Sequence, residues 1–450
     1  MGRINEIRSN TIIIFCLFLL FSCKNEVKQL NEPSLEDKIA AAVESRKIPT
    51  LNEQKVDFTA PEWIEGRGPH STEIFRHLEN YIPTVLIEKG STETKALPMN
   101  ISNTLGQEIL SSTFIQKETS LDQICDEKQI NGVIILHQGQ IVYEKYPEME
   151  ASDRHFLGSV SKSFIGTVIG NLADEGILNE QDTISKFLPE FKGKALANVS
   201  IENLLRMSSG TDCREHVKDR VSFTDSNHCF YQLLQHSALF PEPKTPFEQN
   251  LMELVANAGA YESQGQIYDY TSANSVILAT IAERASSKPF HQLVQEYIWS
   301  KIGAKNDART TLSSTGVAGS YGTMLMCLRD LARYGLAFTD DATTKIASER
   351  YLSQIHQGDQ ELFRSEGGTG QRLWLQFYED QGPLFQSYHW DVVFEDGAFA
   401  KFGLGGQGVY ISPEKRLVIA FFSANKDETA NNNVMMYLVR SLALLDQFNG

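Results

Sequence analysis

Paired cysteine motifs are missing from this sequence. Its six cysteines stand at positions 16, 23, 125, 213, 229 and 327, and no two of them form a CxxC pair. Zinc and iron–sulfur sites are commonly built from such pairs, so the sequence gives these sites no support. We therefore expect no metal site.

Positive charge is also in short supply. The chain of 450 residues carries 41 lysines and arginines against 57 aspartates and glutamates, which gives a net charge of −16 at pH 7. Nucleic-acid phosphates would repel so acidic a protein, and we expect no nucleic-acid partner. Hydrophobic residues still make up 41% of the chain and aromatic residues 10%, as in a globular protein with a sizeable core.

Long apolar runs are absent except at the start of the chain. Two arginines precede this run, which ends at Phe21 and is followed by Ser22-Cys23. It is too short to cross a bilayer comfortably, so residues 1–22 are predicted to be a signal peptide. The leucine three positions before Cys23 resembles the lipobox of bacterial lipoproteins.

The lipobox resemblance implies that Cys23 becomes the lipidated first residue of an exported protein. That protein would be anchored to a membrane and would face the periplasm or the cell surface. An ordinary cleaved signal or an uncleaved anchor is the alternative. Residues 23–60 are polar apart from a short amphipathic helix opened by Pro33 and Ser34, and we expect them to form a tether.

Strand patterns lie on both sides of a helical middle in the remaining domain, residues 61–450. "NGVIILHQGQIVYEKY", from Asn131, is two strand-like runs around a turn, and "GQGVYISPEKRLVIAFFSAN" is a second pair near the end. Helical patterns dominate between them, and we expect a helical insertion at about 180–340. This order predicts an α/β (α+β) fold whose sheet is assembled from both ends of the chain.

Two cysteines of the helical middle fall in one polar, irregular region. Cys213 and Cys229 could form a disulfide there if the protein is exported. The alternative is that they are isolated thiols, as we expect for Cys125 and Cys327.

The stretch "GSVSKSF" places Ser159 three residues before Lys162. On a helix this spacing puts both side chains on one face, where lysine can activate the serine hydroxyl. The same spacing recurs after Ser412 and Ser423, so the motif alone decides nothing. Only the first pair lies where strand-rich chain leads into a helix, whose N-terminus favours negative charge. A plain N-cap serine is the alternative.

Other segments follow in order, among them "VSIENLLRMSSGT", "YDYTSANSVILATIAERAS" and "GLGGQGVYISPEKRLVIAFFS". With "GSVSKSF" they make the sequence resemble the serine β-lactamase and penicillin-binding-protein superfamily over about residues 75–446. The resemblance is to its class C-like esterase and 6-aminohexanoate-dimer-hydrolase branch. It implies a β-lactamase-like antiparallel sheet flanked by helices, with an all-helical insertion domain.

The resemblance also implies roles for three residues. Ser159 matches the acylated nucleophile, Lys162 its activating partner, and Tyr270 the tyrosine that exchanges protons with nucleophile and leaving group. Sequence leaves open which of Lys162 and Tyr270 is the base in each step. No metal or organic cofactor is implied.

Two departures from the family pattern bear on the substrate. Ser272 stands where the family asparagine usually follows the tyrosine, so Asn274 is taken as the corresponding site residue. The third family motif, typically Lys-Thr-Gly or His-x-Gly, is matched to residues 404–406, which contain no cation. Because that cation helps to hold a substrate carboxylate, good penicillin turnover is not expected.

The remaining substrate contacts are expected from the backbone and from aromatic residues. The N–H groups of Ser159 and Gln407, next to Gly406, are expected to form the oxyanion hole. Trp390 is a candidate for the acyl pocket, although most large aromatic residues belong to protein cores.

These features predict a serine hydrolase of the carboxylesterase or amidase type, acting on an ester or amide bond of a small molecule. A peptidoglycan or D-amino-acid peptidase of the same fold is one alternative. A catalytically silent lipoprotein that binds a ligand is another, although the joint presence of Ser159, Lys162 and Tyr270 argues against it. The α/β-hydrolase type is excluded because the chain has no GxSxG elbow.

Overall fold

The computed structural model describes residues 33–44, 63, 70–115, 117–216, 221–243, 246–378, 381–424 and 433–449. The chain divides into two units, Met1–Pro33 and Ser34–Gly450, and the features below belong to the second. The expected signal peptide and Cys23 lie outside the described residues. No helix in the described ranges is both long and apolar enough to cross a bilayer.

The larger sheet joins strands from both halves of the chain, as predicted. All neighbouring strands in it are antiparallel. Its seven strands lie in the order β3 (Gln140–Lys145), β2 (Gly132–His137), β11 (Leu417–Phe422), β10 (Gln407–Ser412), β9 (Phe399–Gly403), β8 (Trp390–Phe394) and β7 (Pro383–Ser387).

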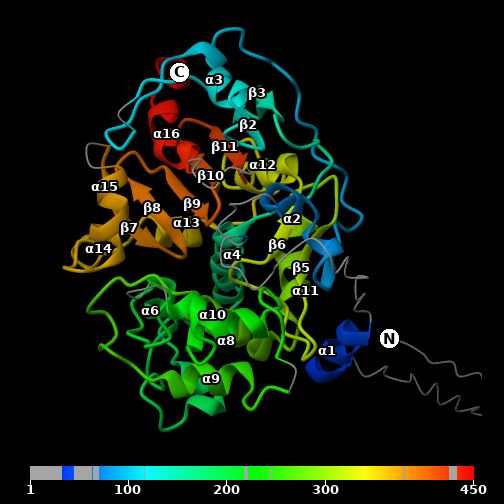
Figure 1. The fold of residues 1–450 in the computed structure, drawn as a ribbon, viewed down its shortest axis with the longest axis vertical. Helices are drawn as coiled ribbons and strands as arrows, with labels where there is room; N and C mark the ends of the chain where they lie inside the picture. The colour runs from blue at the N-terminus through cyan, green and yellow to red at the C-terminus, as the bar shows by residue number, and fades with distance from the viewer. Residues whose placement is uncertain are drawn as a thin grey trace, which may run out of the picture. The chain divides into compact units, whose positions relative to one another are not determined.

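Helices cover both faces of this sheet. Consecutive residues of a strand point to opposite faces, so Val409 and Tyr410 of β10 mark the two sides. On one face, a Cβ added at Gly335 of α12 (Leu328–Leu336) would lie 3.3 Å from Val409 of β10. On the other, Tyr410 accepts a hydrogen bond of 2.7 Å from Arg440 of α16 (Val434–Ala443). Figure 1 shows both helices beside the central strands.

A second, four-stranded sheet is not predicted by the sequence. Its strands are only two to four residues long, too short to show a period. They lie in the order β1 (Thr84–Ile87), β5 (Ala308–Thr311), β6 (Met324–Met326) and β4 (His155–Phe156). Because β5 and β6 fall within 180–340, that range is not wholly helical, and α12 follows these two strands within it.

Helix α4 (Ser161–Asp174) lies between the larger sheet and the helical region that contains α6 and α10 (Figure 1). It ends before Gly176, whose φ is +71°. The other helices are α1 (Leu35–Glu44), α2 (Ser71–His77), α3 (Leu121–Asp126), α5 (Ile184–Phe187), α6 (Ile201–Leu205), α7 (Val221–Thr224), α8 (Cys229–His236), α9 (Leu251–Ala258), α10 (Ser272–Ser286), α11 (Phe290–Val294), α13 (Glu349–Ile355), α14 (Gln360–Phe363) and α15 (Leu375–Phe377), with π-helices at Gln295–Trp299 and Gly370–Trp374.

One local expectation is confirmed, and the structure decides between two alternatives that the sequence leaves open. The helix expected after Pro33 is α1, and Ser34 caps it by accepting the amide of Asp37 at 3.1 Å. Cys213 and Cys229 form a disulfide, which ties the chain just before Glu215 to the start of α8.

Candidate active site

Ser159 lies in a single turn of 3-10 helix, Gly158–Val160, that leads directly into α4. Lys162 is in the first turn of α4. Its Nζ donates hydrogen bonds to Ser159 Oγ at 2.9 Å and to Tyr321 O at 2.7 Å. The three-residue spacing therefore brings hydroxyl and amine together, as predicted.

The other serines of "GSVSKSF" have different partners. Ser161 Oγ accepts the amide of Met324 at 3.2 Å, and Ser163 Oγ donates to Val160 O at 2.8 Å. The second SxxK pair is also separated, because Lys415 Nζ donates to Ala443 O at 3.0 Å. Local helix geometry thus selects Ser159.

The amine of Lys162 is buried, and this burial lowers its pKa to about 7. The charge of Lys401 lowers the pKa as well, whereas the carboxylates of Glu215 and Asp391 raise it. A substantial fraction of Lys162 is therefore neutral near pH 7 and able to accept a proton.

Tyr270 comes two residues before α10 and completes the group around Ser159. Lys162 Nζ lies 5.0 Å from its ring centroid. Burial raises the pKa of Tyr270 well above its ordinary value, and the carboxylates of Asp391 and Glu215 add to the rise. The phenol stays protonated at neutral pH, which suits it to donate a proton.

The structure places a cation beside Tyr270 that the match of the third motif to residues 404–406 does not include. Lys401 of β9 donates a hydrogen bond of 3.2 Å to Tyr270 OH, and Gly403 completes a Lys-x-Gly pattern two residues later. Residues 401–403 are therefore a second possible match to this motif. Lys401 is fully buried and forms an ion pair with Asp391 of β8.

A signal for this pair is present in the sequence. The strands "WDVVF" and "FAKFG" are apolar apart from one charge each, and the two charges are of opposite sign. Buried charges are nearly always paired, so a single opposite charge in each of two adjacent apolar strands indicates an ion pair.

The backbone opposite Ser159 is that of Gly403 and Leu404, not that of Gln407 as expected. A Cβ added at Gly403 would lie 3.2 Å from Ser159 N, and one added at Gly158 would lie 3.2 Å from Leu404 N. In the described ranges no hydrogen-bond acceptor contacts either amide. Two unpaired amides close to the serine are what an oxyanion hole requires.

Gly406 and Gln407 form hydrogen bonds that hold the turn after Gly403 in place. Gly406 N donates to Gly403 O at 3.0 Å, and Gln407 Nε2 donates to Ser423 O at 2.8 Å. Gln407 Oε1 would lie 2.9 Å from a Cβ at Gly403. Their contacts are therefore with the loop and the neighbouring strand.

The structure does not bring Asn274 or Trp390 to the site. Asn274 is fully buried, and its Oδ1 accepts a hydrogen bond of 2.6 Å from Ser209. The residue of this helix that lines the cavity is Ser272. Trp390 belongs to the core, with its ring centroid 4.6 Å from that of Phe399.

A cavity of about 30 Å³ lies beside Ser159. Its charged member is Glu215, whose Oε2 accepts hydrogen bonds from Ser272 N at 3.0 Å and Ser272 Oγ at 2.8 Å. Glu215 is not predicted from the sequence, because its irregular segment has no period or motif that would single it out. Most other lining residues are apolar: Phe156, Phe223, Phe230, Leu234, Leu239, Tyr321 and Leu404.

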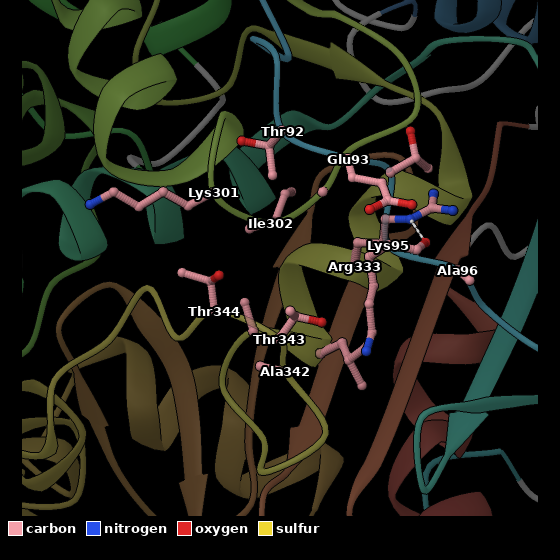
Figure 2. A pocket seen from close by; sticks show the side chains of 14 residues that line it. Thr92, Glu93, Lys95, Ala96, Lys301, Ile302, Arg333, Ala342, Thr343 and Thr344 are labelled. Carbon is pink, nitrogen blue, oxygen red and sulfur yellow. Dashed lines mark hydrogen bonds between the residues drawn. The ribbon is translucent and has the colours of Figure 1, made fainter.

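A larger pocket of about 260 Å³ lies elsewhere (Figure 2). Its wall includes Thr92, Lys301 and Arg333, and Arg333 Nε donates to Lys95 O at 2.9 Å. None of the residues around Ser159 lines it. Across the described ranges, no group of three or more histidine, cysteine or acidic residues could hold a metal ion.

Comparisons with known proteins agree with this geometry. A family model described as Beta-lactamase matches residues 118–444. The 6-aminohexanoate-dimer hydrolase of Paenarthrobacter ureafaciens is 26% identical over 374 residues, which cover 82% of this chain and 88% of that protein.

Two solved structures share the fold. A Bacillus anthracis protein described as a 6-aminohexanoate-dimer hydrolase has a TM-score of 0.71 at 20% identity, covering 89% of this chain and 99% of its own. A penicillin-binding protein from Bacillus halodurans has a TM-score of 0.53 at 15% identity, covering 72% and 100%. The chain belongs to the Beta-lactamase family of hydrolases, in the branch that contains a 6-aminohexanoate-dimer hydrolase.

Proposed function

We propose that this chain is a serine hydrolase that cleaves ester or amide bonds through an acyl-enzyme on Ser159. The observation that carries the proposal is the 2.9 Å contact between Ser159 Oγ and the buried amine of Lys162. Since the pKa of that amine is about 7, its neutral form is available to take the hydroxyl proton.

The proposed reaction uses the surrounding groups in turn. Ser159 Oγ bonds to the substrate carbonyl carbon while Lys162 takes its proton, and the amides of Ser159 and Leu404 stabilise the oxyanion. Tyr270 then protonates the leaving group as the scissile bond breaks, and the proton held by Lys162 restores Tyr270. Water then attacks the carbonyl carbon of the resulting ester, one of its protons passes to Ser159 Oγ through Lys162 or Tyr270 as the acyl bond breaks, and the acid is released. Lys401 stabilises the tyrosine oxygen while it lacks its proton.

Hydrolysis of p-nitrophenyl butyrate tests this proposal. Ser159→Ala is expected to lower kcat/KM by about a thousandfold or more, because the nucleophile and its base act as a unit. Ser412→Ala, which removes the serine of the second SxxK pair, is the matched control and should retain activity. Wild-type activity in Ser159→Ala would contradict the proposal.

The substrate is proposed to be a small ester or amide whose acyl part carries an amine. Glu215 supports this choice, because its carboxylate lies in a largely apolar cavity and Ser272 contacts only its Oε2. A cationic amine would pair with such a carboxylate. The name of the Paenarthrobacter relative also includes an amino acid, 6-aminohexanoate.

Glu215→Gln tests the substrate class. We expect kcat/KM for an aminoacyl ester to fall about tenfold or more, while kcat/KM for the matching alkyl ester changes little, since only the charged substrate loses its partner. Equal losses for both esters would contradict the amine preference.

We also propose that the protein is exported and anchored to a membrane by a lipid on Cys23. The support is the sequence pattern before Cys23. Metabolic labelling with an alkyne fatty acid should mark the wild-type protein and leave Cys23→Ala unlabelled. Labelling of both would contradict the proposed anchor.

A further inference from the structure

Asp391 and Lys401 form a buried ion pair beside Tyr270. Strands β8 and β9 are antiparallel with Val392 opposite Ala400, so Asp391 and Lys401 take the next opposed positions. Asp391 is 2% exposed and Lys401 0%. One oxygen of Asp391 accepts from Lys401 Nζ, and the other accepts the amide of Phe402 at 2.9 Å. These two contacts fix the orientation of the carboxylate.

Lys401 has a second partner in Tyr270. Its Nζ lies 3.2 Å from the phenol oxygen and 4.7 Å from the ring centroid. Burial lowers the pKa of Lys401, and the charge of Asp391 opposes this change. A buried ammonium without a counter-charge would tend to lose its proton.

We propose that Asp391 is a positioning residue that holds the Lys401 ammonium on Tyr270 and prevents it from receiving a substrate carboxylate. The proposal rests on the proposed serine-hydrolase function. A cation that is already paired with a buried carboxylate gains little interaction energy from a second carboxylate, and the two carboxylates repel each other. Substrates that carry a carboxylate at this position are therefore disfavoured, although the cation itself is present.

Other charged and titratable groups act on this pair, and all of them belong to neighbouring elements. The charge of Lys401 lowers the pKa of Lys162 and of His389, and the charge of Glu215 raises the pKa of Lys401. The charge of Asp391 raises the pKa of Tyr268, Tyr270 and Tyr378. None of them is in a position to replace Asp391, since the ion pair that Lys401 forms within the described ranges is with Asp391.

Asp391→Asn tests the proposal with two readouts. Removing the carboxylate disfavours the charged form of Lys401, so the basic limb of the kcat/KM profile for a neutral ester should move down by about one pH unit or more. At pH 6, the kcat/KM ratio of a carboxylate-bearing ester to a neutral ester should rise about tenfold. Both changes are required, and a folded variant in which either stays at its wild-type value overturns the proposal.

The matched control is Asp330→Asn. Asp330 is 0% exposed and pairs at 2.7 Å with Arg333, which lines the pocket of Figure 2. Its loss should lower stability, as expected for a broken buried pair, but leave the pH profile and the ester ratio unchanged. If Asp330→Asn moved the profile as Asp391→Asn does, the effect would be structural and the proposal overturned.

A second comparison covers the case in which Asp391→Asn does not fold. Lys401→Met and the double variant Lys401→Met/Asp391→Asn should acylate with a serine-directed phosphonate at rates within about threefold of each other, because the proposal assigns the main effect of Asp391 to its contact with Lys401. A further loss of about tenfold in the double variant would overturn the proposal. If the wild type gives no Ser159 adduct, the hydrolase function itself fails. An adduct with unchanged readouts overturns only the role of Asp391.

Discussion

At the scale of single residues, the buried amine of Lys162 sets the pH range of the proposed reaction. Its pKa of about 7 means that kcat/KM should rise as the pH increases through about 7, because only the neutral amine accepts the serine proton. Lys162→Met should lower kcat/KM by about a hundredfold or more. The pH profile of ester hydrolysis checks both expectations.

Lys415→Met, in the second SxxK pair, is the control and should leave the profile unchanged. A flat profile from about pH 5 to 9 would contradict the assignment of Lys162 as the base.

Gly158 tests the oxyanion hole through the backbone. Its φ is +51°, and an added Cβ would lie 3.1 Å from Leu404 O and 3.2 Å from Leu404 N. Gly176 also has a positive φ, +71°, but nothing lies within 4 Å of an added Cβ. Alanine at either position should lower the free energy of unfolding by about 1 kcal/mol.

Only Gly158→Ala is expected to lose activity. A displaced Leu404 amide should lower kcat by about a hundredfold or more, as the loss of one oxyanion donor does elsewhere. Thermal unfolding and ester hydrolysis, measured on both variants, separate the two effects. Equal activity in Gly158→Ala and Gly176→Ala would show that the Leu404 amide is not a donor.

Part of the site is predictable from single residues and part is not. Ser159 and Lys162 meet because a helix brings positions three apart together, which sequence spacing reveals. Lys401 was missed because glycines at 403, 405 and 406 allow two matches to one motif. The contact that decides between them, Lys401 to Tyr270, joins positions 131 residues apart.

At the scale of elements, long periodic segments were predictable and short ones were not. The β2–β3 and β10–β11 hairpins and helix α4 agree with their patterns. Strands β1, β4, β5 and β6 are too short to show a period, and tertiary pairing alone defines them. The range expected for the helical insertion, about 180–340, therefore also contains β5 and β6.

The Cys213–Cys229 disulfide gives a prediction at this scale. The bridge joins cysteines 16 residues apart and fastens the chain beside Glu215 to α8, which supplies Phe230 to the cavity. Replacing both cysteines by serine should lower the free energy of unfolding by about 2 to 4 kcal/mol.

Thermal unfolding with and without dithiothreitol checks this expectation. The reductant should lower the Tm of the wild type and leave that of the double serine variant unchanged. A wild-type Tm that does not respond to reduction of the bridge would contradict the stabilising role.

At the scale of the whole molecule, the site lies entirely within the unit Ser34–Gly450. Residues from the first helix turn of α4, from the helical region and from the C-terminal strands meet at Ser159, so activity depends on the complete unit. A chain that begins at Ser34 should keep the kcat/KM of the full-length protein within about twofold, because no described catalytic contact is removed. A large loss in this truncated chain would place part of the site before Ser34.

The central claim is that Ser159 is the nucleophile. The most direct measurement is mass spectrometry of the full-length protein after treatment with a serine-directed fluorophosphonate. We expect one adduct, on the peptide that contains Ser159, formed faster as the pH rises through about 7 and absent in Ser159→Ala. An adduct that persists in Ser159→Ala, or no adduct on the wild-type protein, would contradict it.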